Sequence, residues 1–84
     1  MKKSVVERFG TFYRDKQEAL DYVDELAKTG IPIYGLEVVK LTKLRAESTM
    51  YKTIWFTSQE NVYERARVFI KDQMVGVWNY VEFK

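Results

Sequence analysis

The segment from Asp15 to Pro32 constrains the fold of this chain most, because it carries the signals for both ends of one helix. Asp15 can cap the N-terminus, and Glu18 follows three residues later, as in a capping box. At the other end, Gly30 suits a left-handed C-terminal cap, and Pro32 forbids continuation. The sequence therefore predicts one helix of about four turns between Asp15 and Gly30.

Segments rich in β-branched and aromatic residues surround this helix, and they predict four strands. These strands cover residues 5–12, 33–44, 49–58 and 75–83, and the polar residues 45–49 connect the second strand to the third. A second helix is predicted to begin after a cap at Thr57 or Ser58. Its apolar stripe consists of Val62, Ala66, Phe69 and Ile70.

The predicted order of elements is β-α-β-β-α-β, which is the order of the ferredoxin-like fold. We therefore expect one α+β domain over residues 1–84, with a four-stranded antiparallel sheet and both helices packed on one face. In that arrangement the second face of the sheet has no helix above it. What lies on this second face becomes the main functional question.

Alternation along the third and fourth predicted strands assigns side chains to the two faces. The aliphatic set of the last strand, Val75, Val77 and Val81, ends at Phe83 and is expected to face the core, as are Ile54 and Phe56. The aromatic residues left for the uncovered face are Tyr51, Trp55, Trp78 and Tyr80. If half of each ring is uncovered, they expose about 300–500 Å², which is near the largest apolar patch of an ordinary monomer. Cross-strand aromatic pairs can also serve the sheet alone, and that interpretation stays open.

The composition removes several kinds of chemistry. The chain has no cysteine and no histidine, so it lacks thiols, disulfides and the usual general base. No glycine-rich phosphate loop or metal-ligand spacing is present in the sequence. We therefore expect no enzymatic activity, no cofactor and no metal. The absence of cysteine suits a reducing cytoplasm, and no apolar run has the length of a membrane span, so a cytoplasmic protein without a membrane partner is expected.

The charge is unevenly distributed, although the net charge is only +2. Residues 15–28 carry five acids and two bases, whereas residues 40–52 carry four bases and one acid. The sequence thus predicts an acidic helix and a basic hairpin. If the partner is acidic, Lys43, Arg45 and Lys52 are the expected electrostatic contributors.

The stretch MYKTIWFTSQENVYERA resembles the third strand and following helix of RNA-recognition motifs. That family stacks bases on aromatic rings of its sheet face, and Tyr51 stands at one of its stacking positions. Thr53 replaces the second stacking aromatic, and Lys52 and Met50 replace small residues. The resemblance implies a module that binds single-stranded RNA or DNA.

A second stretch, FGTFYRDKQEALDYVDELAKTGI, is similar to the strand–helix unit of SPOR peptidoglycan-binding domains. The matching residues are Gly10, Thr11, Phe12, Ala19, Leu26, Gly30 and Ile31. This similarity covers only the first half of the chain, and no binding residue is carried over from it.

The residues favour a small interaction or regulatory module. It would bind a protein partner, or a second copy of itself as a homodimer, through Tyr51, Trp55, Trp78 and Tyr80. The alternative is a single-stranded nucleic-acid-binding module in which Lys43, Arg45 and Lys52 follow the phosphate backbone.

Overall fold

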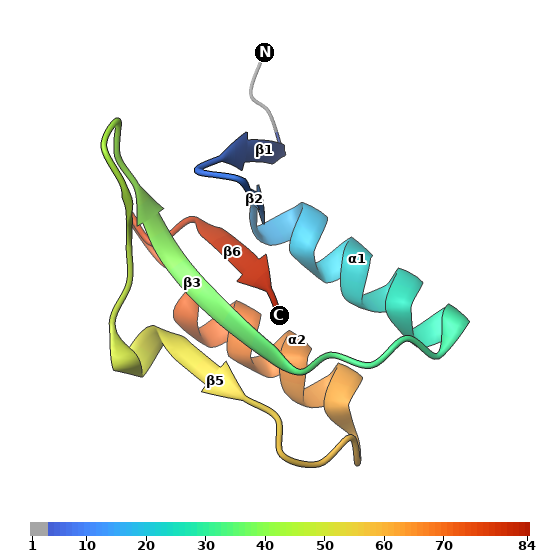
Figure 1. The fold of residues 1–84 in the computed structure, drawn as a ribbon. Coiled ribbons are helices and arrows are strands. Elements are labelled where there is room, and N and C mark those ends of the chain that lie inside the picture. The colour runs from blue at the N-terminus through green and yellow to red at the C-terminus, as the bar shows by residue number, and fades with distance from the viewer. Residues whose placement is uncertain (1–3) are drawn as a thin grey trace.

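The computed structural model describes residues 4–84, which form a mixed α+β domain (Figure 1). Its helices are α1 (Lys16–Thr29), α2 (Val62–Gln73) and the single 3₁₀ turn η1 (Met50–Lys52). Its strands are β1 (Val5–Arg8), β2 (Thr11–Arg14), β3 (Gly35–Leu41), β4 (Ala46–Glu47), β5 (Thr53–Trp55) and β6 (Tyr80–Phe83).

The strands form an antiparallel sheet in the order β1-β2-β6-β3-β4, and β5 also pairs with β3. The last strand of the chain, β6, therefore lies between β2 and β3. One end of β3 pairs with β5, and its other end pairs with β4. The prediction of a four-stranded sheet was wrong, since residues 4–84 form six strands, and the ferredoxin-like topology is not confirmed.

The first predicted strand, residues 5–12, is part of a hairpin instead. Strands β1 and β2 pair up to Arg8 and Thr11, which leaves Phe9 and Gly10 as the turn. Both turn residues are left-handed, with φ of 56° and 72°, as the two-residue type I′ turn requires. Gly10 adopts this conformation freely, but a bulky residue such as Phe9 rarely does. No standard turn pair therefore marks the position in the sequence.

Helix α1 confirms the end signals of the sequence. Asp15 Oδ1 accepts a hydrogen bond from the Glu18 backbone N–H at 3.0 Å. Gly30 has φ of 70°, and its N–H donates to the Leu26 carbonyl. The helix ends where Gly30 was predicted to end it.

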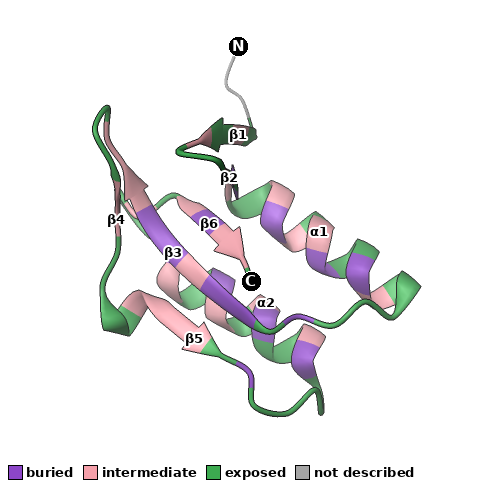
Figure 2. Ribbon diagram, in the orientation of Figure 1, coloured by how far each residue is buried: buried purple, intermediate pink, exposed green. Residues whose placement is uncertain are grey.

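Both helices cover the same face of the sheet (Figure 1), and the buried residues line the space between the two layers (Figure 2). The core consists of Ala19, Val23, Leu26, Ile33, Leu36, Val38, Phe56, Val62, Ala66, Ile70, Met74 and Val81. Ile54 and Phe83 pack against this cluster. The predicted inward direction of Ile54 and Phe56 is thus confirmed.

The third and fourth predicted strands are much shorter in the structure. Of residues 49–58, only β5 is a strand, and η1 precedes it. The last strand begins at Tyr80 rather than at residue 75, because Gly76 is left-handed and the chain turns back, with Trp78 N–H donating to the Val75 carbonyl. Val75 and Val77, predicted to face the core, are exposed. The turn breaks the alternation on which their assignment rested.

Helix α2 starts later than predicted. Its N-cap is Asn61, which has φ of 54° and forms no side-chain cap, so the predicted cap at Thr57 or Ser58 was wrong. Val62, Ala66 and Ile70 are buried as predicted. Among residues 4–84, neither helix has the length and apolar content that crossing a bilayer requires.

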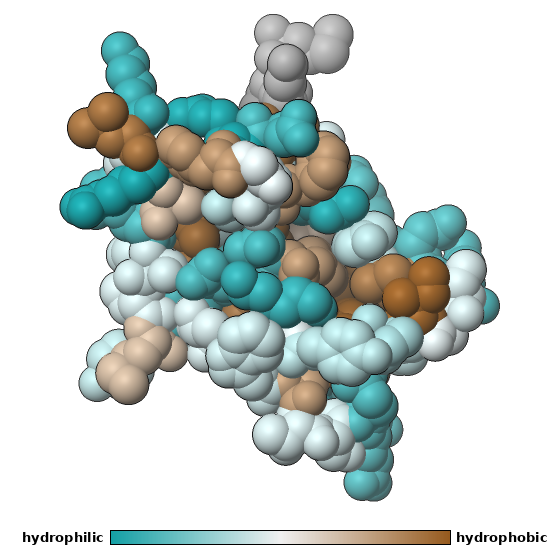
Figure 3. Space-filling model, in the orientation of Figure 1, coloured by the Kyte–Doolittle hydropathy of each residue, from teal (hydrophilic) through white to brown (hydrophobic). Residues whose placement is uncertain are grey.

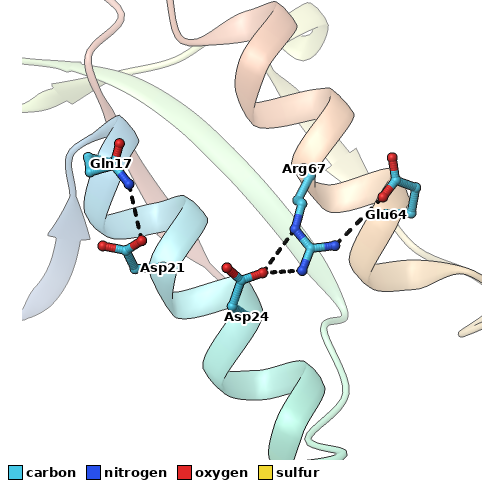
Figure 4. Close-up of polar contacts among 5 residues, drawn as sticks. All are labelled: Gln17, Asp21, Asp24, Glu64 and Arg67. Carbon is cyan, nitrogen blue, oxygen red and sulfur yellow. Dashed lines mark hydrogen bonds and ion pairs between the residues drawn. The ribbon is translucent and has the colours of Figure 1, made fainter.

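An arginine joins the two helices on their outer side (Figure 4). Arg67 of α2 donates from Nε to Asp24 Oδ1 of α1 at 3.0 Å, and its Nη2 contacts the same oxygen. Its Nη1 lies 3.6 Å from Glu64 Oε2. The acidic face of α1 is therefore partly neutralised within the domain.

Candidate functional site

The register of the sheet assigns each side chain to one of its two faces. Leu36 of β3 belongs to the core beneath the helices, so its neighbours Gly35 and Glu37 point to the opposite face. Cross-strand pairing puts Trp55 opposite Gly35 and Glu82 opposite Glu37. We call this side of the sheet, away from both helices, the open face.

Trp55 is the most exposed aromatic residue of the strands on the open face. It is 61% exposed, although the inner edge of its indole rests on Gly35. A β-carbon at position 35 would lie 2.8 Å from Trp55 Cε3, so only glycine leaves room for the ring. The Lys84 ammonium lies 5.9 Å from the ring centroid, within cation–π range. The ring is thus held in place and still presents most of its surface to solvent.

A network of charged side chains lies beside Trp55 on the open face. Lys84 Nζ is 3.1 Å from Glu82 Oε1 and 3.6 Å from Glu37 Oε1. Ser48 Oγ donates to Glu37 Oε2 at 2.9 Å. Partial burial acts to lower the pKa of Lys84, but the hydrogen bond to Glu82 and the charges of Glu82 and Glu37 outweigh it and raise this pKa. Two carboxylates and one ammonium give this part of the face a net negative charge.

The far end of the open face is already covered by the protein itself. Tyr13 is 5% exposed and Val39 is fully buried, yet neither belongs to the core beneath the helices. Burial is the main cause that raises the pKa of Tyr13, and the charge of Glu82 acts in the same direction. At this end Arg8 Nη2 of β1 donates to the Thr42 carbonyl at 2.8 Å, across the sheet. The accessible part of the open face is therefore the end that carries Trp55.

The structure does not bring the four predicted aromatic residues together on one face. Trp55 is on the open face, and the register puts Tyr80 there too, where it is half-buried. Tyr51 lies in η1 and is 82% exposed. Trp78 precedes β6 and packs against the core on the side of the helices. The predicted shared face was wrong for Trp78, because the turn at Gly76 shifts its side chain out of the strand register.

The three predicted basic residues are also separated. Lys43 and Arg45 are exposed in the tight turn between β3 and β4, and Arg45 pairs with Glu47 at 3.5 Å. Lys52 Nζ donates to the Gln73 carbonyl at 2.7 Å and lies 5.6 Å from the Trp78 ring. The Lys52 ammonium is thus bound at the C-terminal end of α2, where the last helix carbonyls lack partners within the helix.

Sequence reasoning missed the residues that give the open face its polar character. Glu37, Glu82 and Lys84 meet only because β6 lies next to β3, a pairing that joins residues far apart in the chain. One local signal was available. Glu37 stands alone between apolar residues of a buried strand, and a single charge in such a position indicates a face that is not apolar.

The surface seen in Figure 3 carries several separate hydrophobic areas with polar side chains between them. Residues 4–84 hold no group of three or more His, Cys, Asp or Glu side chains that could bind a metal ion. Comparison of the chain with protein-family models, curated proteins and solved structures finds no match. The candidate site is accordingly defined by geometry: the exposed ring of Trp55, its glycine support and the charges beside it.

Proposed function

We propose that this protein is a non-catalytic interaction module that binds a partner protein through the open face, with Trp55 as the anchor. The observation that supports it is the state of Trp55, which is held against Gly35 while 61% of it remains exposed. Tryptophan is among the residues in which binding energy concentrates at interfaces. A ring fixed before binding loses little conformational entropy when a partner covers it.

The charges beside Trp55 favour a protein over a nucleic acid. Glu37 and Glu82 lie on the same face, and their carboxylates would repel a phosphate backbone. Lys43 and Arg45 lie near the opposite end of β3 from Gly35, which is about 20 Å away for a strand of this length. A partner with a basic residue near an apolar pocket matches the open face better than a polyanion does.

A second copy of the chain is the first partner to test. Sedimentation equilibrium between 5 and about 200 μM, a range that detects affinities typical of weak interfaces, compares the wild type with Trp55→Ala. Tyr51→Ala is the matched control, because Tyr51 is also a strongly exposed aromatic but lies in η1. We expect any dimer to weaken about tenfold or more in Trp55→Ala and to persist in Tyr51→Ala.

If the wild type is a monomer at every concentration, the partner is another protein. A photo-cross-linking amino acid in place of Ser48, which is exposed beside Glu37 on the open face, should then capture a protein whose yield falls when excess wild type is added, but not when excess Trp55→Ala is added. Equal competition by both competitors would contradict the anchoring role of Trp55.

Nucleic-acid binding is tested by the anisotropy of labelled oligo-dT and oligo-U at low and moderate salt. We expect no binding at protein concentrations up to 100 μM, in the range of weak nonspecific affinity, about 10⁻⁴ to 10⁻⁶ M. Binding that weakens steeply with salt and is lost in Trp55→Ala would replace the protein partner by a nucleic acid.

A further inference from the structure

Strands β2 and β6 are neighbours in the sheet, but they pair at one position only. That position joins Arg14 to Val81, whereas β6 continues beside β3 to Phe83 and β2 continues beside β1 to Thr11. A cavity of about 340 Å³ lies where the two strands separate. We call it the β2–β6 cleft, and its lining residues are Gly10, Thr11, Phe12, Arg14, Tyr22, Glu82 and Phe83.

Arg14 lines this cleft, and within residues 4–84 its guanidinium has no acceptor. Its Cζ atom lies 3.7 Å from the ring centroid of Tyr22 and 5.8 Å from that of Phe83. Its Nε is buried and has no hydrogen-bond partner among the described residues. A buried donor left unpaired is unfavourable. The Nη groups of Arg14 also have no acceptor among residues 4–84, and these are the groups that a ligand in the cleft can bind.

The other described arginines differ from Arg14, because their side chains have acceptors. Each of them reaches an acceptor: Arg8 the Thr42 carbonyl, Arg45 the Glu47 carboxylate, Arg65 the Ser58 and Glu60 carbonyls, and Arg67 the Asp24 carboxylate. Within residues 4–84, Arg14 alone is held by aromatic rings only. Stacking fixes the plane of a guanidinium and leaves its N–H groups available for a carboxylate.

The acidic residue that lines the cleft is already paired with a lysine. Glu82 lines the cleft, but its Oε1 binds Lys84 at 3.1 Å on the open face. Among the described residues the Arg14 guanidinium forms no ion pair, because the carboxylate of Glu82 binds Lys84 instead. A guanidinium without a carboxylate partner favours an anionic ligand.

The backbone of β6 offers a second contact. Lys84 N–H donates to the Gly35 carbonyl, and hydrogen bonds between antiparallel strands alternate in direction along each strand. The N–H and C=O groups of Phe83 therefore point away from β3, toward the side where β2 has already separated. An extended peptide can pair with such an unpaired stretch of a strand.

We propose that the β2–β6 cleft binds an acidic peptide in an extended conformation. An Asp or Glu carboxylate of the peptide accepts hydrogen bonds from Arg14, and the peptide backbone pairs with Phe83. Arg14 pairs with Val81, a core residue on the side of the helices, so Arg14 and Trp55 belong to opposite faces of the sheet, although Glu82 both lines the cleft and lies among the charges beside Trp55. Either site can therefore fail its test while the other holds.

The test is an NMR titration of the ¹⁵N-labelled protein with two capped peptides, acetyl-Val-Thr-Glu-Val-Thr-amide and the same sequence with Gln in place of Glu. We expect the Glu peptide to shift the Arg14 Nε–H and Phe83 amide signals in a saturable manner. The Gln peptide should bind about tenfold more weakly, because charge-assisted bonds to guanidinium are lost. Equal binding of both peptides, or no shift at these two signals, overturns the proposal.

Two arginine variants and a small carboxylate test which parts of the protein and of the peptide contribute to binding. Arg14→Gln should abolish the preference for the Glu peptide, and Arg45→Gln, which alters an exposed arginine paired with Glu47, should keep it. If Arg14→Gln does not fold, the comparison of the two peptides on the wild type still decides. Sodium acetate should shift the Arg14 signal only at far higher concentration than the peptide, and saturation by acetate at peptide concentrations would overturn the extended-peptide ligand.

Discussion

Trp55 Cε3 lies 2.8 Å from the point where a β-carbon on Gly35 would stand. The indole thus rests on the backbone of the paired strand, in the manner of an aromatic side chain that covers a glycine across a sheet. The same contact limits the rotamers of Trp55 and excludes side chains from position 35. Support of the candidate anchor and stability of the sheet are therefore coupled at one residue pair.

Gly35→Ala should lower the free energy of unfolding by about 1–3 kcal/mol, as overpacking usually does. The new methyl would also lie 2.9 Å from the Ile54 carbonyl oxygen, which is backbone and cannot move aside cheaply. Urea denaturation measures the loss. When Gly35→Ala is made in the Trp55→Ala variant, it should lower the free energy of unfolding by less, because only the contact with the Ile54 carbonyl remains. An unchanged urea midpoint for Gly35→Ala alone would show that the Trp55 ring is not held against Gly35.

Phe9→Asn should raise the free energy of unfolding by about 1 kcal/mol, because asparagine tolerates the left-handed conformation that Phe9 adopts at φ of 56°. Phe12→Asn is the control, since Phe12 is also exposed but lies within β2. That control should gain nothing, because asparagine is disfavoured in strands. Equal effects of the two variants would argue against strain at the turn.

Stability should fall in alkaline solution as pH rises above about 10, the ordinary pKa of tyrosine. The folded state raises the pKa of Tyr13 and also that of Lys84. The folded protein therefore keeps protons that the unfolded chain releases, and this contribution is lost as pH rises through the folded pKa values. Chemical denaturation from pH 8 to 11 measures the slope. Tyr13→Phe should reduce it, and a slope unaffected by this change would contradict the role of Tyr13.

Asp24 and Arg67 should show a coupling free energy of about 0.5–1 kcal/mol in a double-mutant cycle with Asp24→Asn and Arg67→Gln. The value is modest because the two side chains are 53% and 29% exposed. High salt should reduce it further. The more exposed pair Arg45–Glu47, at 3.5 Å, serves as the comparison and should give a coupling near zero.

The sequence predicts best what local chemistry decides. Helix α1 has its N-cap at Asp15 and its C-cap at Gly30 as predicted, because each signal acts within a few residues. The hairpin turn at Phe9 escaped prediction because the sterics of phenylalanine disfavour the left-handed conformation that the turn between β1 and β2 requires there. The turn at Gly76 also escaped prediction, and it moved Val75, Val77 and Trp78 off their predicted faces, whereas Val81 and Phe83 after the turn kept theirs.

The candidate site was predicted in part, through Trp55, whose neighbours Ile54 and Phe56 have clear inward positions. Its charged surroundings were not predictable. The proximity of Lys84 to Glu37 depends on β6 lying beside β3, and long-range strand order leaves no mark on either local segment. Arg14 likewise gains its significance only from the separation of two strands.

The two tryptophans differ in exposure, so intrinsic fluorescence can report separately on two parts of the molecule. Trp55 meets solvent on the open face, whereas Trp78 packs against the core on the side of the helices. A small neutral quencher such as acrylamide should therefore extinguish the emission of one indole well before the other. Quenching of Trp55 then reports binding to the open face, and quenching of Trp78 reports loosening of the core, so one fluorescence experiment distinguishes the two events.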